Sequence, residues 1–216
     1  MSNKKKYYAV RKGRQTGIFY DWNTCKEQIN GFSGAEYKSF PSEQEAKAYI
    51  ANKPKKVSDI DITMSFEELY KRFNTFDEAI AYVDGSYDET LKKYASSEII
   101  ITNGELYIGA IAGNDELMLP MKNVAGEILA AMRAVEHCIA LGVAKVYLCY
   151  DYEGIEKWCT EAWACNKEGT KLYKEWYDEA IKNIDIEFIK VAGHTGVELN
   201  EKADELAKKA LREDII

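Results

Sequence analysis

Two short apolar runs, each followed by an aspartate, constrain the fold of this chain more than any other feature. Residues 79–83 are all apolar and lead to Asp84, and residues 146–150 are all apolar and lead to Asp151. A nearly continuous apolar run is typical of a strand that is covered on both faces of a sheet. If these strands are parallel neighbours, both acids emerge at the carboxyl edge of the sheet, where open α/β sheets place their sites. The pattern predicts an α/β domain.

Hydrophobic periodicity and turn signals predict the other elements of this domain. Two strands, 97–102 and 105–112, meet at Asn103-Gly104, which is a strong hairpin signal between apolar runs. A helix over 124–141 places an apolar residue on one face at each turn. The remaining expected elements are helices near 153–164, 170–183 and 200–212, and a strand over 185–191.

The first 50 residues form a separate pattern. Short strand and helix signals alternate there in the order β-β-α-β-α, with Ser42 and Glu45 as a capping box for the last helix. We therefore expect a small domain over 6–50, a linker over 51–76 that contains a short helix, and a larger domain over 77–213.

Composition excludes several classes of protein. With 46% hydrophobic and 30% charged residues, the chain is globular in composition. It has no apolar run of about 18 residues, so no membrane span or membrane partner is expected. No apolar stretch follows the lysines near the N-terminus, so no secretion signal is expected. The five cysteines are odd in number and scattered, which favours a reduced, cytoplasmic protein.

Charge is distributed unevenly along the chain. Residues 1–50 contain nine Lys/Arg and five Asp/Glu, whereas residues 51–216 contain 20 and 31. The small domain is therefore basic and the larger one acidic, although the whole chain has a net charge of −7. A basic domain on an acidic body suggests that the small domain contacts a polyanion.

Four carboxylates are candidate metal ligands. Asp84 and Asp151 follow the two apolar runs, Glu127 opens the helix at 124–141, and Asp204 lies on the last helix. Magnesium prefers hard oxygen ligands and keeps waters for substrate phosphates. Two such ions can activate an attacking water and stabilise the leaving oxygen of a phosphodiester. Zinc is not expected, because the chain has two histidines and no paired cysteines.

The larger domain resembles the ribonuclease H type 1 family. The matching motifs, in order, are Tyr82-Val83-Asp84-Gly85-Ser86, Gly126-Glu127-Ile128-Leu129-Ala130-Ala131, Tyr150-Asp151, Gly193-His194-Thr195-Gly196 and Asn200-Glu201-Lys202-Ala203-Asp204-Glu205-Leu206-Ala207. The resemblance implies a mixed five-stranded sheet flanked by helices. It also implies an endonuclease that cuts the RNA strand of RNA/DNA hybrids, leaving 5′-phosphate and 3′-hydroxyl ends, with two Mg²⁺ ions or with Mn²⁺ as a substitute.

The resemblance also assigns roles to single residues. Asp84 would bridge both ions, with Glu127 and Asp151 completing one metal site and Asp204 holding the other ion. His194 would assist water activation or product departure, for which its pKa range is suited. Gly85, Ser86 and Asn123 would contact the nucleic acid. The chain departs from the family pattern at Val124, in place of a second asparagine, and at Glu153, which would face a phosphate.

The small domain resembles the hybrid-binding domain, related to viroplasmin domains, that precedes many ribonucleases H. The match rests on Tyr7-Tyr8-Ala9-Val10-Arg11-Lys12-Gly13-Arg14-Gln15-Thr16-Gly17 and on Trp22-Asn23. The resemblance implies a hybrid-binding surface made of Tyr8, Arg11, Lys12, Arg14, Trp22, Tyr37 and Lys38. Trp22 has an alternative role as an anchor of this domain's core.

These features together predict a monomeric, two-domain ribonuclease H whose partner is an RNA/DNA hybrid. Two alternatives remain open at this stage. One is a nonenzymatic duplex-binding protein on the same scaffold, and the other is a nuclease of the same fold that acts on duplex RNA, which is also expected as a weaker partner.

Overall fold

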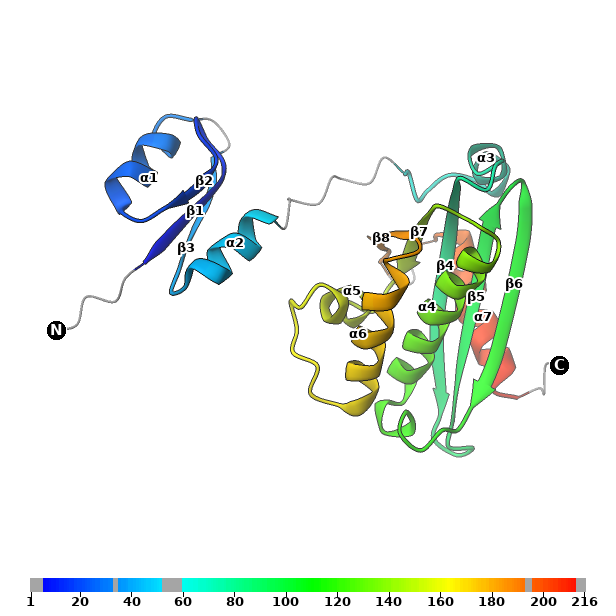
Figure 1. Ribbon diagram of the computed structural model, residues 1–216. Coiled ribbons are helices and arrows are strands. Elements are labelled where there is room, and N and C mark those ends of the chain that lie inside the picture. Colours follow the sequence, from blue (N-terminus) through cyan, green and yellow to red (C-terminus); the bar gives the residue numbers. More distant parts are fainter. Residues whose placement is uncertain (1–5, 33–34, 52–59, 193–195, 213–216) are drawn as a thin grey trace. The chain divides into compact units, whose positions relative to one another are not determined.

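The computed structural model describes residues 6–32, 35–51, 60–192 and 196–212. The chain divides into two compact units, residues 1–59 and residues 60–216. Figure 1 colours both units along the sequence. Each unit is described by itself.

The first unit is a three-stranded antiparallel sheet with two helices. Its elements are β1 (Tyr7–Lys12), β2 (Gly17–Phe19), α1 (Trp22–Ile29), β3 (Glu36–Phe40) and α2 (Glu43–Ala51), with sheet order β2-β1-β3. The predicted β-β-α-β-α order is confirmed. Asp21 caps α1 by accepting from the Thr24 amide at 2.9 Å, and Ser42 accepts from the Glu45 amide at 3.2 Å at the start of α2. The capping residues therefore fix where both helices begin.

The core of the first unit is small. Val10 of β1 packs against Cys25 and Ile29 of α1, and Ala9 and Ala46 of this unit are also fully buried. Trp22 does not belong to this core, because 42% of its surface is exposed. The alternative role of Trp22 as a core anchor is therefore not supported.

The second unit contains a mixed five-stranded sheet. Its strands are β4 (Glu78–Asp88), β5 (Lys93–Thr102), β6 (Glu105–Gly113), β7 (Lys145–Tyr150) and β8 (Asp185–Lys190), in the order β6-β5-β4-β7-β8. β4 pairs in parallel with β7, and β7 with β8, whereas β4, β5 and β6 are antiparallel. The predicted fold class is confirmed, including the parallel pairing of the two apolar runs.

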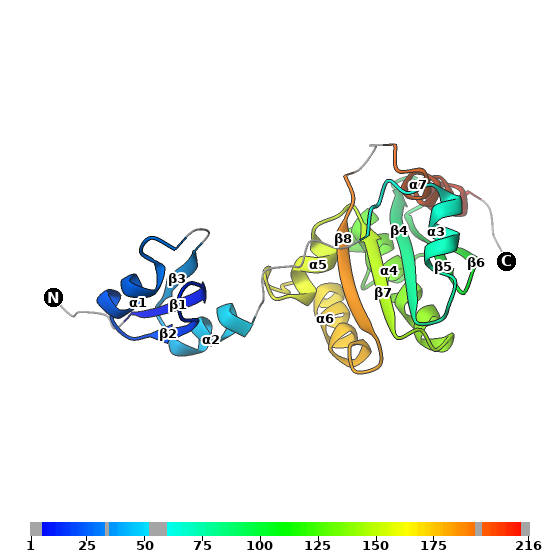
Figure 2. The same ribbon diagram turned by 90° about the horizontal axis from the view of Figure 1, so that it is seen from above.

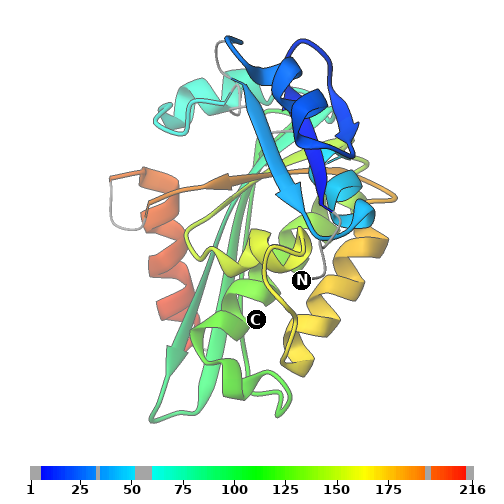
Figure 3. The ribbon, with the colours of Figure 1, turned by 90° about the vertical axis from the view of Figure 1, so that its left-hand side faces the viewer.

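Helices cover both faces of this sheet. They are α3 (Phe66–Arg72), α4 (Asn123–Ala140), α5 (Gly154–Cys159), α6 (Glu168–Ala180) and α7 (Glu198–Ala210), with a 3₁₀ turn at Leu119–Met121. α4, α5 and α6 pack on one face, and α3 and α7 pack on the other, as Figure 2 shows from above. Figure 3 shows α7 (red) and α6 (orange) on opposite sides of the strands.

Side chains of β4 point alternately to the two faces of the sheet, which explains this arrangement. Ala79, Ala81 and Val83 face α4, whereas Ile80 and Tyr82 face α3 and α7. All five side chains are at most 1% exposed. A strand that is apolar at every position can be buried on both faces only in the middle of such a three-layer stack.

β4 is longer than its apolar run predicts. The parallel ladder with β7 ends at Tyr82 and Cys149, but the antiparallel ladder with β5 continues to Asp88. Asp84 therefore lies within a strand and is paired with Ser97, whereas it was expected at a strand end. The sequence did not reveal this extension, because residues after 83 lose the apolar pattern once β7 no longer flanks the strand.

α5 is shorter than predicted. The helix ends at Cys159, where the Thr160 hydroxyl donates to the Glu156 carbonyl at 2.9 Å and Glu161 adopts a φ of 60°. A non-glycine residue in this left-handed region cannot continue a right-handed helix. Residues 160–167 form the connection to α6.

Helix α3 packs on the second unit. Ser65 and Glu68 form a capping box, and Leu69 and Phe73 are each 1% exposed in the core that α7 also covers. No helix among the described residues has the length and hydropathy needed to cross a bilayer.

Candidate active site

Three carboxylates meet at the carboxyl edge of β7. Asp84 comes from the middle of β4, Glu127 from the second turn of α4, and Asp151 directly follows β7. Each offers one oxygen, and these oxygens lie within 4.8 Å of one another. Asp84 is 7% exposed and Glu127 is 3% exposed. Carboxylates this close and this buried repel each other strongly unless protons or cations compensate them.

Two glycines allow α4 to approach β4 so closely. A Cβ atom at Gly85 would lie 2.1 Å from the Glu127 amide nitrogen, and one at Gly126 would lie 2.0 Å from the Ala95 carbonyl oxygen. Neither distance is possible for a real side chain. The helix backbone therefore rests on the strand backbone, and this contact places Glu127 beside Asp84.

Helix α7 brings Asp204 to the same pocket. The Ser97 hydroxyl donates to the Ala203 carbonyl at 2.6 Å, and Ser97 is also the cross-strand partner of Asp84. Ser97 thus links α7, which carries Asp204, to β4, which carries Asp84. Asp204 accepts from Lys208 Nζ at 2.6 Å, which partly balances its charge.

Two of the clustered acids, Asp84 and Glu127, have raised pKa values. Burial, followed by the charge of Asp151, raises the pKa of Asp84 from 3.8 to about 7. Burial, followed by the charges of Asp84 and Asp151, raises the pKa of Glu127 well above its usual value. A hydrogen bond between Glu127 and Asp84 favours the charged form of Asp84 and the neutral form of Glu127, and the Gly85 amide donates to Asp84 at 2.7 Å. Glu127 therefore carries the shared proton.

The donor set fits a hard divalent cation. It consists of oxygens, the ligands that magnesium and manganese prefer. Among the described residues, two buried side-chain atoms have no hydrogen-bond partner, Glu127 Oε2 and Asn200 Oδ1. Both belong to residues that line the same pocket. Buried acceptors without donors in an acidic pocket fit a site that binds a cation.

The pocket has a volume of about 300 Å³. It is lined by Asp84, Gly85, Asn123, Glu127, Asp151, Tyr152, Asn200, Glu201 and Asp204. The structure thus brings together the four predicted acids and two predicted contact residues. Ser86 does not line the pocket, and His194 lies outside the described residues. Sequence reasoning missed Tyr152, Asn200 and Glu201 as lining residues. The spacing of four between Asn200 and Asp204 on one helix could have indicated Asn200.

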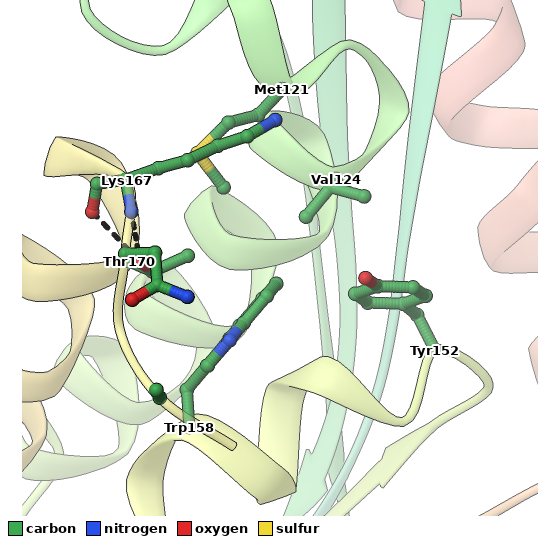
Figure 4. Close-up of a pocket in the computed structure, with 8 residues that line it drawn as sticks. Met121, Val124, Tyr152, Trp158, Lys167 and Thr170 are labelled. Atoms are coloured by element: carbon green, nitrogen blue, oxygen red, sulfur yellow. Dashed lines mark hydrogen bonds between the residues drawn. The ribbon is translucent and has the colours of Figure 1, made fainter.

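A second hollow of about 260 Å³ adjoins the acidic pocket, and Tyr152 lines both. Figure 4 shows Tyr152 and Trp158 beside Val124, with Lys167 and Thr170 on the far side. The ring of Tyr152 lies 5.7 Å from that of Trp158. The hollow beside the acidic pocket therefore combines aromatic faces with a lysine.

Glu153 is neutralised by two lysines. Its carboxylate accepts from Lys157 and, at 2.6 Å, from Lys190. These two hydrogen bonds lower the pKa of Glu153 to about 2. Glu153, at which the chain departs from the family pattern, therefore belongs to a cluster of one acid and two lysines with a net positive charge.

In the first unit, three predicted contact residues form an aromatic series, in which Tyr8 is half-buried and the other two are exposed. Tyr8 and Trp22 have ring centroids 5.5 Å apart, and those of Trp22 and Tyr37 are 5.9 Å apart. Trp22 and Tyr37 are 42% and 45% exposed. Exposed aromatic faces of this kind can stack on bases or sugars.

The predicted basic residues of this unit differ in their surroundings. Arg11 donates to the Tyr49 carbonyl at 2.5 Å with its guanidinium 3.7 Å from the Tyr49 ring centre, and Arg14 donates to two carbonyls at the end of α1. Lys12 and Lys38 are exposed. Both arginines therefore have partners within the domain, and the lysines present their charge outward.

Solved structures share the fold of the second unit. Ribonuclease H1 from the archaeon Halobacterium salinarum aligns with a TM-score of 0.53 at 23% identity, over 62% of this chain and 97% of that chain. LC11-RNase H1, solved in complex with an RNA/DNA hybrid, aligns with a TM-score of 0.53 at 17% identity, over 64% and 99%.

Sequence relatives match either almost the whole chain or a part of it. Ribonuclease H1 of Mus musculus is 27% identical over 261 residues, which cover 96% of this chain and 90% of that protein. Ribonuclease H of Saccharomyces cerevisiae is 50% identical over 50 residues, which cover 23% of this chain and 14% of that protein.

Two family models match the chain. The one described as the ribonuclease H1 N-terminal domain matches residues 6–50, and the one described as RNase H matches residues 77–212. The second match alone covers more than half of the sequence. The chain therefore belongs to the ribonuclease H family of enzymes.

Proposed function

We propose that this protein hydrolyses the RNA strand of RNA/DNA hybrids, using two divalent cations and leaving 5′-phosphate and 3′-hydroxyl ends. The observation that carries this proposal is the meeting of Asp84, Glu127 and Asp151 within 4.8 Å in a buried, oxygen-only cluster. Family membership supports the choice of hybrid as substrate, and the LC11 relative was solved with such a hybrid.

In this proposal the acids hold the cations. Asp84, Glu127 and Asp151 would hold cations together, and Asp204 would add a ligand from α7. When bound, the ions make a water a stronger nucleophile and neutralise the charge on the leaving oxygen. The proton shared by Glu127 and Asp84 must leave as the cations enter, because ligating carboxylates are ionised. His194 is proposed to assist proton transfer.

Substrate contacts flank the acids in this proposal. Gly85 and Asn123 line the pocket, and with Ser86 they contact the hybrid next to the cut, while Glu127 lies near the 2′-hydroxyl. The 2′-hydroxyl is the group that lets a protein distinguish RNA from DNA. Selection of the RNA strand would follow from these contacts.

The domain at residues 6–50 is proposed to bind the hybrid without cutting it. The aromatic series Tyr8, Trp22 and Tyr37, with Lys12 and Lys38, supports stacking and phosphate contacts that do not depend on sequence. Residues 51–76 connect this domain to the catalytic domain at 77–213. The tether would raise the local concentration of substrate at the acids.

The variant Asp84→Asn tests the proposal. The change removes one negative charge at the centre of the cluster and keeps the size of the side chain. We expect cleavage of a labelled hybrid in Mg²⁺ to fall by at least about a thousandfold, while hybrid binding measured by fluorescence anisotropy persists. Asn74→Asp, on the surface beyond α3, serves as a control that should retain full activity. Turnover by Asp84→Asn near the wild-type rate would contradict the metal-site assignment.

The same assay identifies the substrate. Hybrid, duplex RNA and duplex DNA are compared in Mg²⁺, in Mn²⁺ and with chelator. Metal-dependent cleavage of the RNA strand in the hybrid supports the proposal. Preferential cleavage of duplex RNA would favour the alternative nuclease.

A further inference from the structure

Asn200 lines the acidic pocket with a side chain that the acids do not explain. It is the third residue of α7, it is 5% exposed, and its Oδ1 atom is buried without a hydrogen-bond partner. Burying an amide oxygen without a partner costs free energy, so such atoms in a folded protein call for an explanation.

Helix capping does not explain the orientation of Asn200. The helix begins at Glu198 after Val197, and no side chain caps it. The Asn200 backbone amide already donates to the Val197 carbonyl at 3.0 Å. The side chain therefore makes no contribution to the helix end through Oδ1.

The position of the second partnerless atom indicates a shared cause. In the part of the chain that the structure describes, the two such buried side-chain atoms are Asn200 Oδ1 and Glu127 Oε2. They come from α7 and α4, on opposite faces of the sheet, yet both residues line one pocket. Two orphaned acceptors in one cavity are best satisfied by one group that both can bind.

The chemistry of the lining narrows this group to a cation. The other charged residues around the pocket are Asp84, Asp151, Glu201 and Asp204, and once ionised their carboxylates accept hydrogen bonds and cannot donate to Oδ1. A divalent cation, directly or through a water that it holds, can satisfy a carbonyl oxygen and the carboxylates together. A neutral amide also adds an oxygen without adding to the repulsion among the acids.

We propose that Asn200 is a further ligand residue of the cation site, with its carbonyl oxygen completing the donors on the α7 side, where Asp204 lies one turn away. This inference rests on the proposed function, since it requires that the acids bind divalent cations. It adds a neutral oxygen ligand to the four carboxylates.

Cation binding by the full chain tests this inference without substrate. Mn²⁺ is titrated into the wild type, Asn200→Ala and Asn200→Asp, and free Mn²⁺ is measured by electron paramagnetic resonance. We expect Asn200→Ala to weaken binding by about 10- to 100-fold, the range seen when a supporting oxygen of a metal site is lost. Asn200→Asp keeps an oxygen of the same reach and should bind Mn²⁺ at least as tightly as the wild type.

Thermal denaturation separates this role from packing. A residue that acts only through packing would lower the melting temperature with chelator and leave the Mn²⁺-induced increase unchanged. A ligand residue instead reduces that increase in Asn200→Ala and preserves it in Asn200→Asp. Should Asn200→Ala fail to fold, Asn200→Ser is measured in its place.

The two proposals fail in different ways. If the wild type binds no Mn²⁺, or binds it equally well after Asp84→Asn, the proposed function itself is wrong. If the wild type binds and Asp84→Asn does not, while Asn200→Ala binds like the wild type, the acids hold the cation and the inference about Asn200 is overturned.

Discussion

At the scale of single residues, the proton shared by Asp84 and Glu127 links the site to pH. The pKa of Asp84 is raised to about 7 from 3.8, chiefly by burial and then by Asp151. The folded protein thus binds more protons than the unfolded chain between these two values. Stability without cations must therefore fall as pH rises through this window, because the unfolded chain ionises more readily.

We accordingly expect the melting temperature with chelator to decline between about pH 4 and about pH 7 more steeply in the wild type than in Asp84→Asn. The difference between the two proteins isolates the carboxyl cluster from all other titrating groups. Added Mg²⁺ should reduce the decline, since it favours the ionised form. Parallel curves for both proteins in chelator would argue against a proton held at this cluster.

At the scale of elements, the contact between α4 and β4 depends on two residues that lack a side chain. A Cβ atom at Gly126 would lie 2.0 Å from the Ala95 carbonyl and 2.9 Å from Gly85 Cα, and backbone atoms cannot give way as a flexible side chain can. An added methyl group would push the helix away from the strand and carry Glu127 with it.

The substitution Gly126→Ala should therefore destabilise the protein by about 1–3 kcal/mol, the usual cost of overpacking. It should also reduce metal affinity, because Glu127 moves away from Asp84. Gly169→Ala is a matched control on α6, where the added atom would meet the sulfur atoms of Met121 and Met118, which can rearrange. Urea denaturation and Mn²⁺ titration measure both effects. Equal stability of the two variants would show that the close contact between α4 and β4 does not require glycine at position 126.

The elements also show how far the sequence predicts this fold. Periodicity and turn signals placed the strands and helices in the right order, and the Asn103-Gly104 hairpin joins β5 and β6 as expected. The continuation of β4 through Asp84 was missed, because the residues after Val83 that pair with β5 carry no apolar signal. The predicted length of α5 was too great. The helix stops because Glu161 adopts a positive φ, and no glycine or proline in the sequence marks this point.

The same limit applies to the site. Four acids could be predicted because each stands out at the end of an apolar pattern or within a motif. Ser97 could not, since its importance comes from a hydrogen bond to α7. Asn200 shares a helix face with Asp204, but the burial of its Oδ1 atom is visible only in the structure. Pattern reveals residues with unusual chemistry, whereas packing decides which ordinary residues support them.

At the scale of the whole molecule, the chain joins a basic unit to an acidic one. The first 50 residues have a net charge of +4, and residues 51–216 contain 20 Lys/Arg and 31 Asp/Glu. Binding of a polyanion should therefore depend on the first unit more than on the second. Because phosphate contacts release counterions, this dependence should weaken as salt rises.

Removal of residues 1–50 should lower hybrid affinity by about tenfold or more at moderate salt, in keeping with the loss of a tethered binding module. The single-turnover rate at saturating hybrid should remain close to that of the full chain. Trp22→Ala within the full chain is a smaller change and should cause part of the same loss of hybrid affinity. Affinity that is unchanged in the shortened protein would remove the binding role of this unit.

Asp84 lies within β4 and pairs with β5, and this pairing has one more consequence. An acid on a loop could change position while the domain stays folded, but Asp84 is one rung of a ladder that runs from Ile80 to Asp88. To displace it, neighbouring backbone hydrogen bonds in the middle of the sheet must break together. The geometry of this carboxylate is therefore as durable as the fold, so that partial unfolding at the edges of the domain leaves the centre of the site intact.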